Sequence, residues 1–127
     1  RPLRKRFYSS REDKFNMVLV NRTRSVVVCE NIREAKTFQE KSRGLLGSDG
    51  KTALCMRTRV GIHTFGMKFP IDVLILHKRH KVVKHKRSLL PGRFFFWNPK
   101  YNQVIEIPTN LMRERIVEIG DEISTTP

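Results

Sequence analysis

Long hydrophobic runs and cysteines are scarce in this chain of 127 residues. The longest apolar run, Ile71 to Leu76, is interrupted by Asp72 and is far shorter than the roughly 20 residues that span a bilayer as a helix. The start of the sequence is polar and basic and has no hydrophobic signal-peptide region, so we expect a cytoplasmic protein. Cys29 and Cys55 allow one disulfide at most, and we expect two buried thiols on neighbouring strands.

Signatures of phosphate-binding, nucleophilic and metal sites are also missing. There is no G-x-x-x-x-G-K-S/T or G-x-G-x-x-G loop to hold nucleotide phosphates, and no G-x-S-x-G elbow to present a nucleophile. A soft-metal site would have to use His63, Met67, Cys55 and Asp72, which do not have the spacing of a recognised ligand cluster. We therefore expect no cofactor and no metal, and we favour a protein that is not an enzyme.

Acidic residues are few, and their distribution is uneven. The chain has 26 Lys and Arg against 12 Asp and Glu, which gives a formal net charge of +14. Between Val73 and Ile105 there is no acid, but there are eight basic residues: Lys78, Arg79, Lys81, Lys84, Lys86, Arg87, Arg93 and Lys100. Such a charge bears on solubility and on polyanionic partners rather than on the fold.

Aromatic residues follow this basic stretch within a predicted hairpin, residues 78–101. Proteins that bind single-stranded nucleic acids neutralise phosphates with cations and stack bases on aromatic rings. Four successive large side chains, Phe94 to Trp97, cannot all point inward from one strand, so at least one should lie at the surface. Alternatively, alternate rings fill the core and the lysines are only solvated. The candidate binding residues of this hairpin are Lys84, Lys86, Arg87, Arg93, Trp97 and Tyr101.

Short apolar runs and turns alternate along most of the chain. Residues 1–16 form a basic extension that we expect to be mobile and that need not be native, and residues 17–127 form one predicted domain. The expected strands are 18–20, 26–29, 53–56, 62–65, 73–77, 82 onward, 94–97, 104–107 and a last one after the turn at 119–123. Helices are expected near 33–44 and 109–116.

This pattern predicts a mostly-β (α+β) fold, a compact β-sandwich or barrel-like domain with one or two short helices. The expected core consists of Val18, Val20, Val27, Leu45, Leu54, Phe65, Val73, Ile75, Val83, Ile105 and Ile119.

Asp72 and Glu106 are the acids that lie inside predicted apolar strands. A buried carboxylate is costly unless it is hydrogen-bonded or paired. If the two strands are adjacent, both carboxylates could face one pocket and perform acid–base catalysis with His63, as in a small hydrolase or lyase. Alternatively, each acid accepts backbone hydrogen bonds or pairs with a basic side chain, which is a structural role.

Ordered motifs along the chain resemble a known family. They are Gly44–Gly47 (Gly-Leu-Leu-Gly), His63–Asp72, Val104–Ile107 with its Glu106, and Gly120-Asp121. From about Met17 to Ile123 they resemble the domain of unknown function family numbered 192. The resemblance implies a compact, mostly-β domain and brings no established activity, cofactor or catalytic residue. The chain departs from the pattern at Gly66, where many members have Trp, and at 108–110, where they have Gly.

These observations favour a small non-enzymatic binding or accessory domain with a candidate pocket near His63, Asp72 and Glu106. Single-stranded nucleic-acid binding through the hairpin 78–101, or catalysis by Asp72 and Glu106, remain as alternatives. A protein-interaction module anchored by residues 94–97 is a further possibility. The partner and the oligomeric state are left open.

Overall fold

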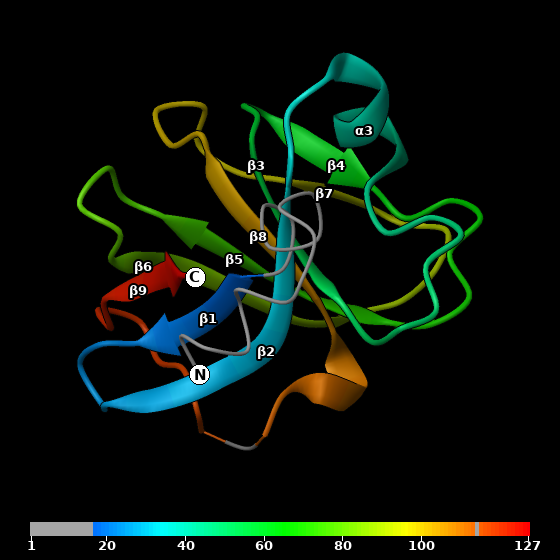
Figure 1. Cartoon of the computed structure of the whole chain (residues 1–127). Coiled ribbons are helices and arrows are strands. Elements are labelled where there is room, and N and C mark those ends of the chain that lie inside the picture. Colours follow the sequence, from blue (N-terminus) through cyan, green and yellow to red (C-terminus); the bar gives the residue numbers. More distant parts are fainter. Residues whose placement is uncertain (1–16, 114) are drawn as a thin grey trace.

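The fold is built mainly from β-strands (Figure 1). The computed structural model describes residues 17–113 and 115–127, so the predicted extension 1–16 lies outside the described residues. The strands are β1 (Met17–Asn21), β2 (Val26–Ala35), β3 (Ala53–Arg57), β4 (Gly61–His63), β5 (Ile71–Leu76), β6 (Val82–Leu89), β7 (Phe94–Phe96), β8 (Gln103–Pro108) and β9 (Ile123–Thr126).

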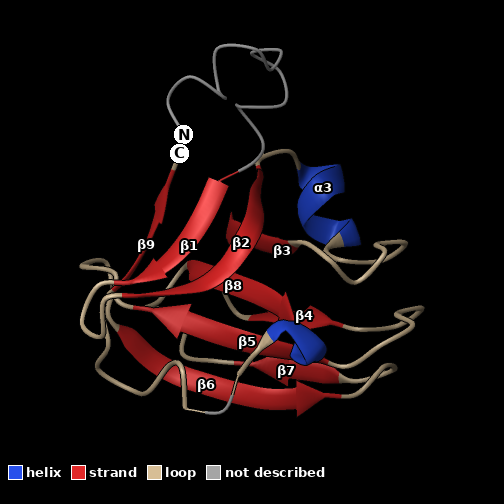
Figure 2. Cartoon of the chain, turned by 60° about the horizontal axis from the view of Figure 1, so that its bottom comes forward, coloured by secondary structure: helices blue, strands red, loops and turns tan. Residues whose placement is uncertain are grey.

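Seven of these strands form one curled sheet in the order β6-β5-β8-β3-β2-β1-β9. Neighbours are antiparallel except β2 and β3, which run parallel. The outermost strands, β6 and β9, approach each other at one end. There Lys81 and Glu122 form an isolated antiparallel backbone β-bridge, and the Ile123 amide donates to the His80 carbonyl at 2.8 Å. The sheet is therefore barrel-like, and the prediction of a mostly-β, barrel-like fold with short helices is confirmed (Figure 2).

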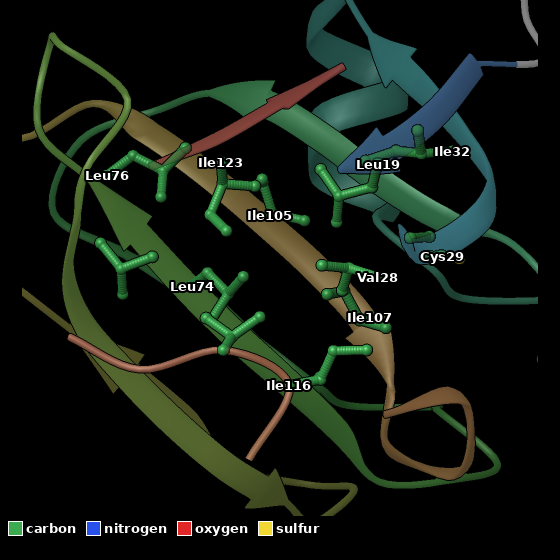
Figure 3. Close-up of a cluster of buried hydrophobic side chains, with 13 residues drawn as sticks. Leu19, Val28, Cys29, Ile32, Leu74, Leu76, Ile105, Ile107, Ile116 and Ile123 are labelled. Carbon is green, nitrogen blue, oxygen red and sulfur yellow. The ribbon is translucent and has the colours of Figure 1, made fainter. Parts of the chain in front are cut away.

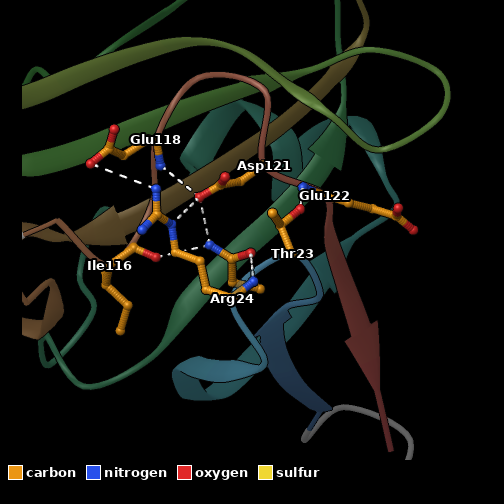
Figure 4. Close-up of polar contacts among 7 residues, drawn as sticks. Thr23, Arg24, Ile116, Glu118, Asp121 and Glu122 are labelled. Atoms are coloured by element: carbon orange, nitrogen blue, oxygen red, sulfur yellow. Dashed lines mark hydrogen bonds and ion pairs between the residues drawn. The ribbon is translucent and has the colours of Figure 1, made fainter.

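A network around Asp121 holds this end together (Figure 4). Oδ2 of the buried Asp121 accepts hydrogen bonds from Asn21 Nδ2 at 2.8 Å, from Arg24 Nε at 2.7 Å and from the Glu118 amide at 2.9 Å. The Asn21 amide nitrogen also donates to the Ile116 carbonyl. The Gly120-Asp121 motif thus has a structural role, because it ties the hairpin after β1 to the turn before β9.

The curled sheet buries apolar side chains on both faces. Its concave face holds one cluster, which includes Leu19, Val28, Ile32, Leu74, Leu76, Ile105, Ile107 and Ile123 (Figure 3). Its other face packs against the small two-stranded sheet β4–β7, through Ile62, Phe95 and Trp97. Because both faces are covered, all six residues of β5 are buried.

Both predicted helices are shorter than expected. The helix predicted at 33–44 is wrong over its first turn, because β2 continues to Ala35 in parallel pairing with β3. Helix α3 occupies only Phe38–Arg43 and begins with a capping box in which Thr37 and Glu40 cap each other. The helix predicted at 109–116 is reduced to one 3₁₀ turn, η1 (Thr109–Leu111). Among the described residues, no helix is long and apolar enough to cross a membrane.

Three residues expected in the core are exposed. Val27, Phe65 and Ile119 have 42%, 45% and 63% of their surface exposed. In β2 the inward position is Val28. Phe65 lies in a turn after β4 where the sequence pattern predicted a strand, and Ile119 lies in the turn that was predicted at 119–123. Among the others, Val18, Val20 and Val83 are half-buried, and Leu45, Leu54, Val73, Ile75 and Ile105 are buried as expected.

Candidate functional site

The three candidate catalytic residues do not share a pocket. Strands β5 and β8 are adjacent, but their register pairs Asp72 with Ile107 and Val73 with Glu106. Neighbouring residues of a strand point to opposite faces, so the carboxylates of Asp72 and Glu106 lie on opposite sides of the sheet. His63 is exposed on β4, opposite Phe94. The structure therefore does not bring the three side chains together in one pocket, and catalysis by these residues stays an untested prediction.

Asp72 is enclosed in hydrogen bonds. Its Oδ2 lies 2.7 Å from His85 Nε2, and its Oδ1 accepts from the Ser88 amide at 3.0 Å and from Thr109 Oγ1 at 2.7 Å. Burial alone would raise the pKa of this carboxyl, but the three hydrogen bonds outweigh burial and hold the pKa below its usual value. Asp72 thus connects β5 to β6 and to the start of η1. This is the structural role that was the alternative to catalysis for this residue.

Glu106 is buried on the other face with little polar support. Burial raises the pKa of its carboxyl to about 7, and the hydrogen bond from the Leu45 amide only partly opposes that shift. The carboxyl lies directly against Gly44, where an added Cβ would be 2.9 Å from Glu106 Oε1. The Glu106 carboxylate therefore packs against the turn that follows α3 and accepts a hydrogen bond from it. Gly44, which has no side chain, leaves the space for this carboxylate.

The basic and aromatic segments predicted to form one hairpin belong to two different sheets. Strand β6 pairs with β5, whereas β7 pairs with β4. Trp97 is only 7% exposed, and its Nε1 donates to the Tyr101 carbonyl at 2.9 Å. Tyr101 is half-buried, and the ammonium of Lys84 lies 5.2 Å from the centre of the buried Phe95 ring. Of the candidate binding residues, Lys86, Arg87 and Arg93 have exposed side chains without such a contact among the described residues.

Four other rings lie together at the surface of the β4–β7 sheet. His63 stacks on Phe65 with 5.5 Å between ring centres, Phe65 meets Phe94 edge-on at 4.9 Å, and Phe94 stacks beside Phe96 at 5.8 Å. Phe65, Phe94 and Phe96 are 45%, 60% and 59% exposed. We call His63, Phe65, Phe94 and Phe96 the aromatic ladder. The exposure of Phe94 and Phe96 confirms the prediction that at least one ring of residues 94–97 lies at the surface. The exposure of Phe65 was not predicted, because its place in an expected strand made it look like a core residue.

The strands and loops that carry the aromatic ladder contain positive charge only. Residues 58–70 and 87–100, which form its strands and loops, contain no acid. They contain five basic residues, all exposed: Arg59, Lys68, Arg87, Arg93 and Lys100. An anionic ligand would therefore meet no charge repulsion from these segments.

A cavity of about 280 Å³ opens at the concave face of the curled sheet. Its lining comes from β1, β2, β3, β5, β8 and β9, and it includes Glu34, Cys55, Arg57 and Gln103. Cys29 and Cys55 are free thiols on the neighbouring strands β2 and β3, Cys29 buried and Cys55 half-buried. Burial, followed by the nearby Glu34 carboxylate, raises the pKa of the Cys55 thiol to about 11, which keeps it in the unreactive protonated form at neutral pH. No group of three or more metal-ligating side chains occurs among the described residues.

Solved structures with a similar fold come from two bacteria. A protein of unknown function from Novosphingobium aromaticivorans matches 86% of this chain and 83% of its own, with a TM-score of 0.69 and 14% identity. A structure titled a putative transcription regulator from Sinorhizobium meliloti matches 87% of this chain and 92% of its own, with a TM-score of 0.72 and 12% identity. At these identities the likeness concerns the fold alone.

Sequence comparisons lead to one family. A UPF0127 protein of Thermococcus sibiricus is 34% identical over 113 residues, which are 84% of this chain and 73% of that protein. A UPF0127 protein of Thermococcus kodakarensis is 32% identical over 119 residues, 87% of this chain and 74% of that protein. The family model DUF192, described as "Uncharacterized ACR, COG1430", matches residues 18–125. The chain therefore belongs to the DUF192 family, whose function is unknown.

Proposed function

We propose that this protein is a non-enzymatic binding module that holds single-stranded nucleic acid on the aromatic ladder. The observation that carries the proposal is the contact chain of exposed rings, His63 to Phe65 to Phe94 to Phe96. Large apolar side chains exposed as a group usually mark an interaction site. Here the rings are held side by side on a paired two-stranded sheet, so little side-chain freedom has to be lost on binding.

Charge favours a nucleic acid over an uncharged partner. The loops and strands that carry the aromatic ladder contain cations and no acid. Phosphates can therefore approach Arg93 and Lys68 while unpaired bases stack on the rings. A duplex keeps its bases stacked inside and cannot use the rings in this way, so single strands should bind more tightly.

Fluorescence anisotropy with labelled single-stranded RNA, single-stranded DNA and duplex DNA at several salt concentrations tests the proposal. The paired substitution Phe94→Ala/Phe96→Ala removes two exposed rings and should weaken single-strand binding about 10-fold or more, since one stack contributes roughly 1–3 kcal/mol. Its salt slope should not change, because the phosphate contacts remain. Arg93→Gln should instead reduce the salt slope by about one.

Leu90→Ala is the matched control, because Leu90 is an apolar residue outside the aromatic ladder that is nearly as exposed (50%). It should bind like the wild type. Equal affinity for single strands and duplex, together with no effect of the Phe94/Phe96 pair, would reject the proposal and leave the charge as an unselective polyanion surface.

A further inference from the structure

The cavity lies on the concave face of the curled sheet, whereas the β4–β7 sheet that carries the aromatic ladder packs against the other face. Its apolar floor is formed by Leu19, Leu76, Ile105 and Ile123, which lie together across the top of the cluster in Figure 3. These residues belong to four different strands of the curled sheet. The cavity is therefore the mouth of a nearly closed barrel, a common position for a small-molecule site.

The charged residues of this mouth lie in its two outer rows. The register places Ile32 beside Ala53 in the innermost row. The next row is Glu34, Cys55 and Ile105, and the outer one contains Arg57, Gln103 and Leu76. A ligand in this mouth would meet an apolar surface on one side and charged groups on the other.

Two opposite charges in this lining have no partner among the residues that the structure describes. Neither the Glu34 carboxylate nor the Arg57 guanidinium forms an ion pair or side-chain hydrogen bond with any residue in the described ranges, 17–113 and 115–127. Glu34 pairs with Cys55, and Arg57 lies two residues beyond Cys55 on the same strand, so the two charges are diagonal neighbours on the concave face. Diagonal neighbours in a sheet lie roughly 7–8 Å apart, close enough to hold both charges of one small molecule.

We propose that the barrel mouth binds a small zwitterion with an apolar side chain, of the amino-acid class. Its ammonium group faces Glu34, its carboxylate faces Arg57, and its side chain lies on Leu19, Ile105 and Ile123. The cavity volume of about 280 Å³ suits a ligand of this size and is at the lower limit for larger organic ligands. Both charges are needed, because a single charge would leave Glu34 or Arg57 unpaired beside the ligand.

An NMR titration of the ¹⁵N-labelled protein with L-leucine tests this inference. Saturable shifts are expected at the amides of Cys55, Gln103 and Ile123. N-acetyl-leucine lacks the ammonium and leucine amide lacks the carboxylate, so each should bind at least 10-fold more weakly. Glycine, which lacks the apolar side chain, should cause no saturable shift at the same concentrations.

Two variants and one control assign the roles of the charged groups. Glu34→Gln should weaken leucine binding and abolish the preference over N-acetyl-leucine, and Arg57→Gln should abolish the preference over leucine amide. Glu30→Gln changes an exposed acid of the same strand and should bind leucine like the wild type. The absence of a saturable shift with L-leucine at millimolar concentration, or equal binding of leucine and N-acetyl-leucine, would overturn the inference. The Phe94→Ala/Phe96→Ala variant should still bind leucine, which separates this site from the aromatic ladder.

Discussion

Asp72 and Glu106 lie on adjacent strands and are equally buried, with 3% of the surface of each exposed, yet their pKa values shift in opposite directions. Three hydrogen bonds keep the pKa of Asp72 low despite burial, whereas Glu106 has one backbone donor and a pKa of about 7. Two causes explain this difference: Glu106 is more deeply enclosed by protein than Asp72, and fewer donors reach its carboxylate. Neither acid lies in the cavity or on the aromatic ladder, so both shifts bear on stability.

Glu106 should make stability depend on pH near neutrality. Its folded pKa of about 7 lies above its usual 4.5, so its contribution to stability is complete below pH 4.5 and is lost as the pH rises through 7. The full loss is at most about 3.5 kcal/mol, since one pKa unit corresponds to about 1.4 kcal/mol. In Glu106→Gln, which keeps an acceptor for the Leu45 amide, the free energy of unfolding should stay flat over this range.

Urea denaturation of both proteins at pH 5, 6, 7 and 8 measures the effect. Glu30→Gln serves as the control, because Glu30 is exposed and should leave the pH profile of the wild type unchanged. Parallel profiles for the wild type and Glu106→Gln would show that Glu106 is not the titrating group.

Among the elements, the small β4–β7 sheet depends on a glycine. In the register Gly61 lies opposite Phe96, and a Cβ at Gly61 would be 2.5 Å from Phe96 Cδ1 and 2.9 Å from the backbone oxygen of Phe95. The ring can rotate away, but the backbone cannot move without breaking the pairing. The glycine therefore lets Phe96 lie over β4 and join the aromatic ladder.

Gly61→Ala should lower the free energy of unfolding by about 1–3 kcal/mol, as overpacking of a close contact does. It should also weaken single-strand binding, because Phe96 is displaced. A thermal melt and the anisotropy assay measure the two effects. Lys68→Ala, at an exposed position in the loop after β4, is the control for the melt and should change it by much less. An unchanged melt for Gly61→Ala would contradict the contact geometry.

Local patterns predicted the strands better than the helices. Residues 94–97 alternate as a strand should, which gives two buried and two exposed rings. Residues 33–35 had a helical spacing, but pairing with β3 extends β2 through them. A strand that gains a parallel neighbour of distant sequence cannot be recognised from its own residues, since the hydrogen bonds that favour it come from the other strand.

At the scale of the whole molecule, closure of the curled sheet depends on Asp121. Its Oδ2 receives three hydrogen bonds, and those from Arg24, Asn21 and the Glu118 amide hold its pKa below the usual value against the opposing effect of burial. The adjoining backbone bonds join β6 to the turn before β9, including Val82 N to the Asp121 carbonyl at 2.9 Å. Loss of the Asp121 carboxylate should therefore loosen the contact between β6 and β9, the two outermost strands of the curled sheet.

Asp121→Asn leaves at least one donor unsatisfied and should cost about 1–3 kcal/mol of stability. Amide hydrogen exchange should quicken at Val82 and Ile123 more than at residues of β5 in the sheet centre. Glu122→Gln is the matched control, because the exposed Glu122 side chain forms no hydrogen bond or ion pair within residues 17–113 and 115–127. The exchange rates of this variant should match those of the wild type. Uniform acceleration across all strands would mean that Asp121 stabilises the fold without a specific role in closure.

The sequence by itself determined the family, the mostly-β fold and the buried centre at β5, because apolar periodicity and ordered motifs are local properties of the chain. Only the tertiary structure decided which side chains meet. The β5–β8 register separates Asp72 from Glu106, and the β4–β7 pairing joins Phe65 to Phe94 from segments about thirty residues apart. Glu34 and Arg57 likewise become neighbours only when β2 pairs with β3. Sites of this kind depend on strand register, because a one-residue shift would move every side chain of a strand to the opposite face of the sheet. No short stretch of sequence contains that information.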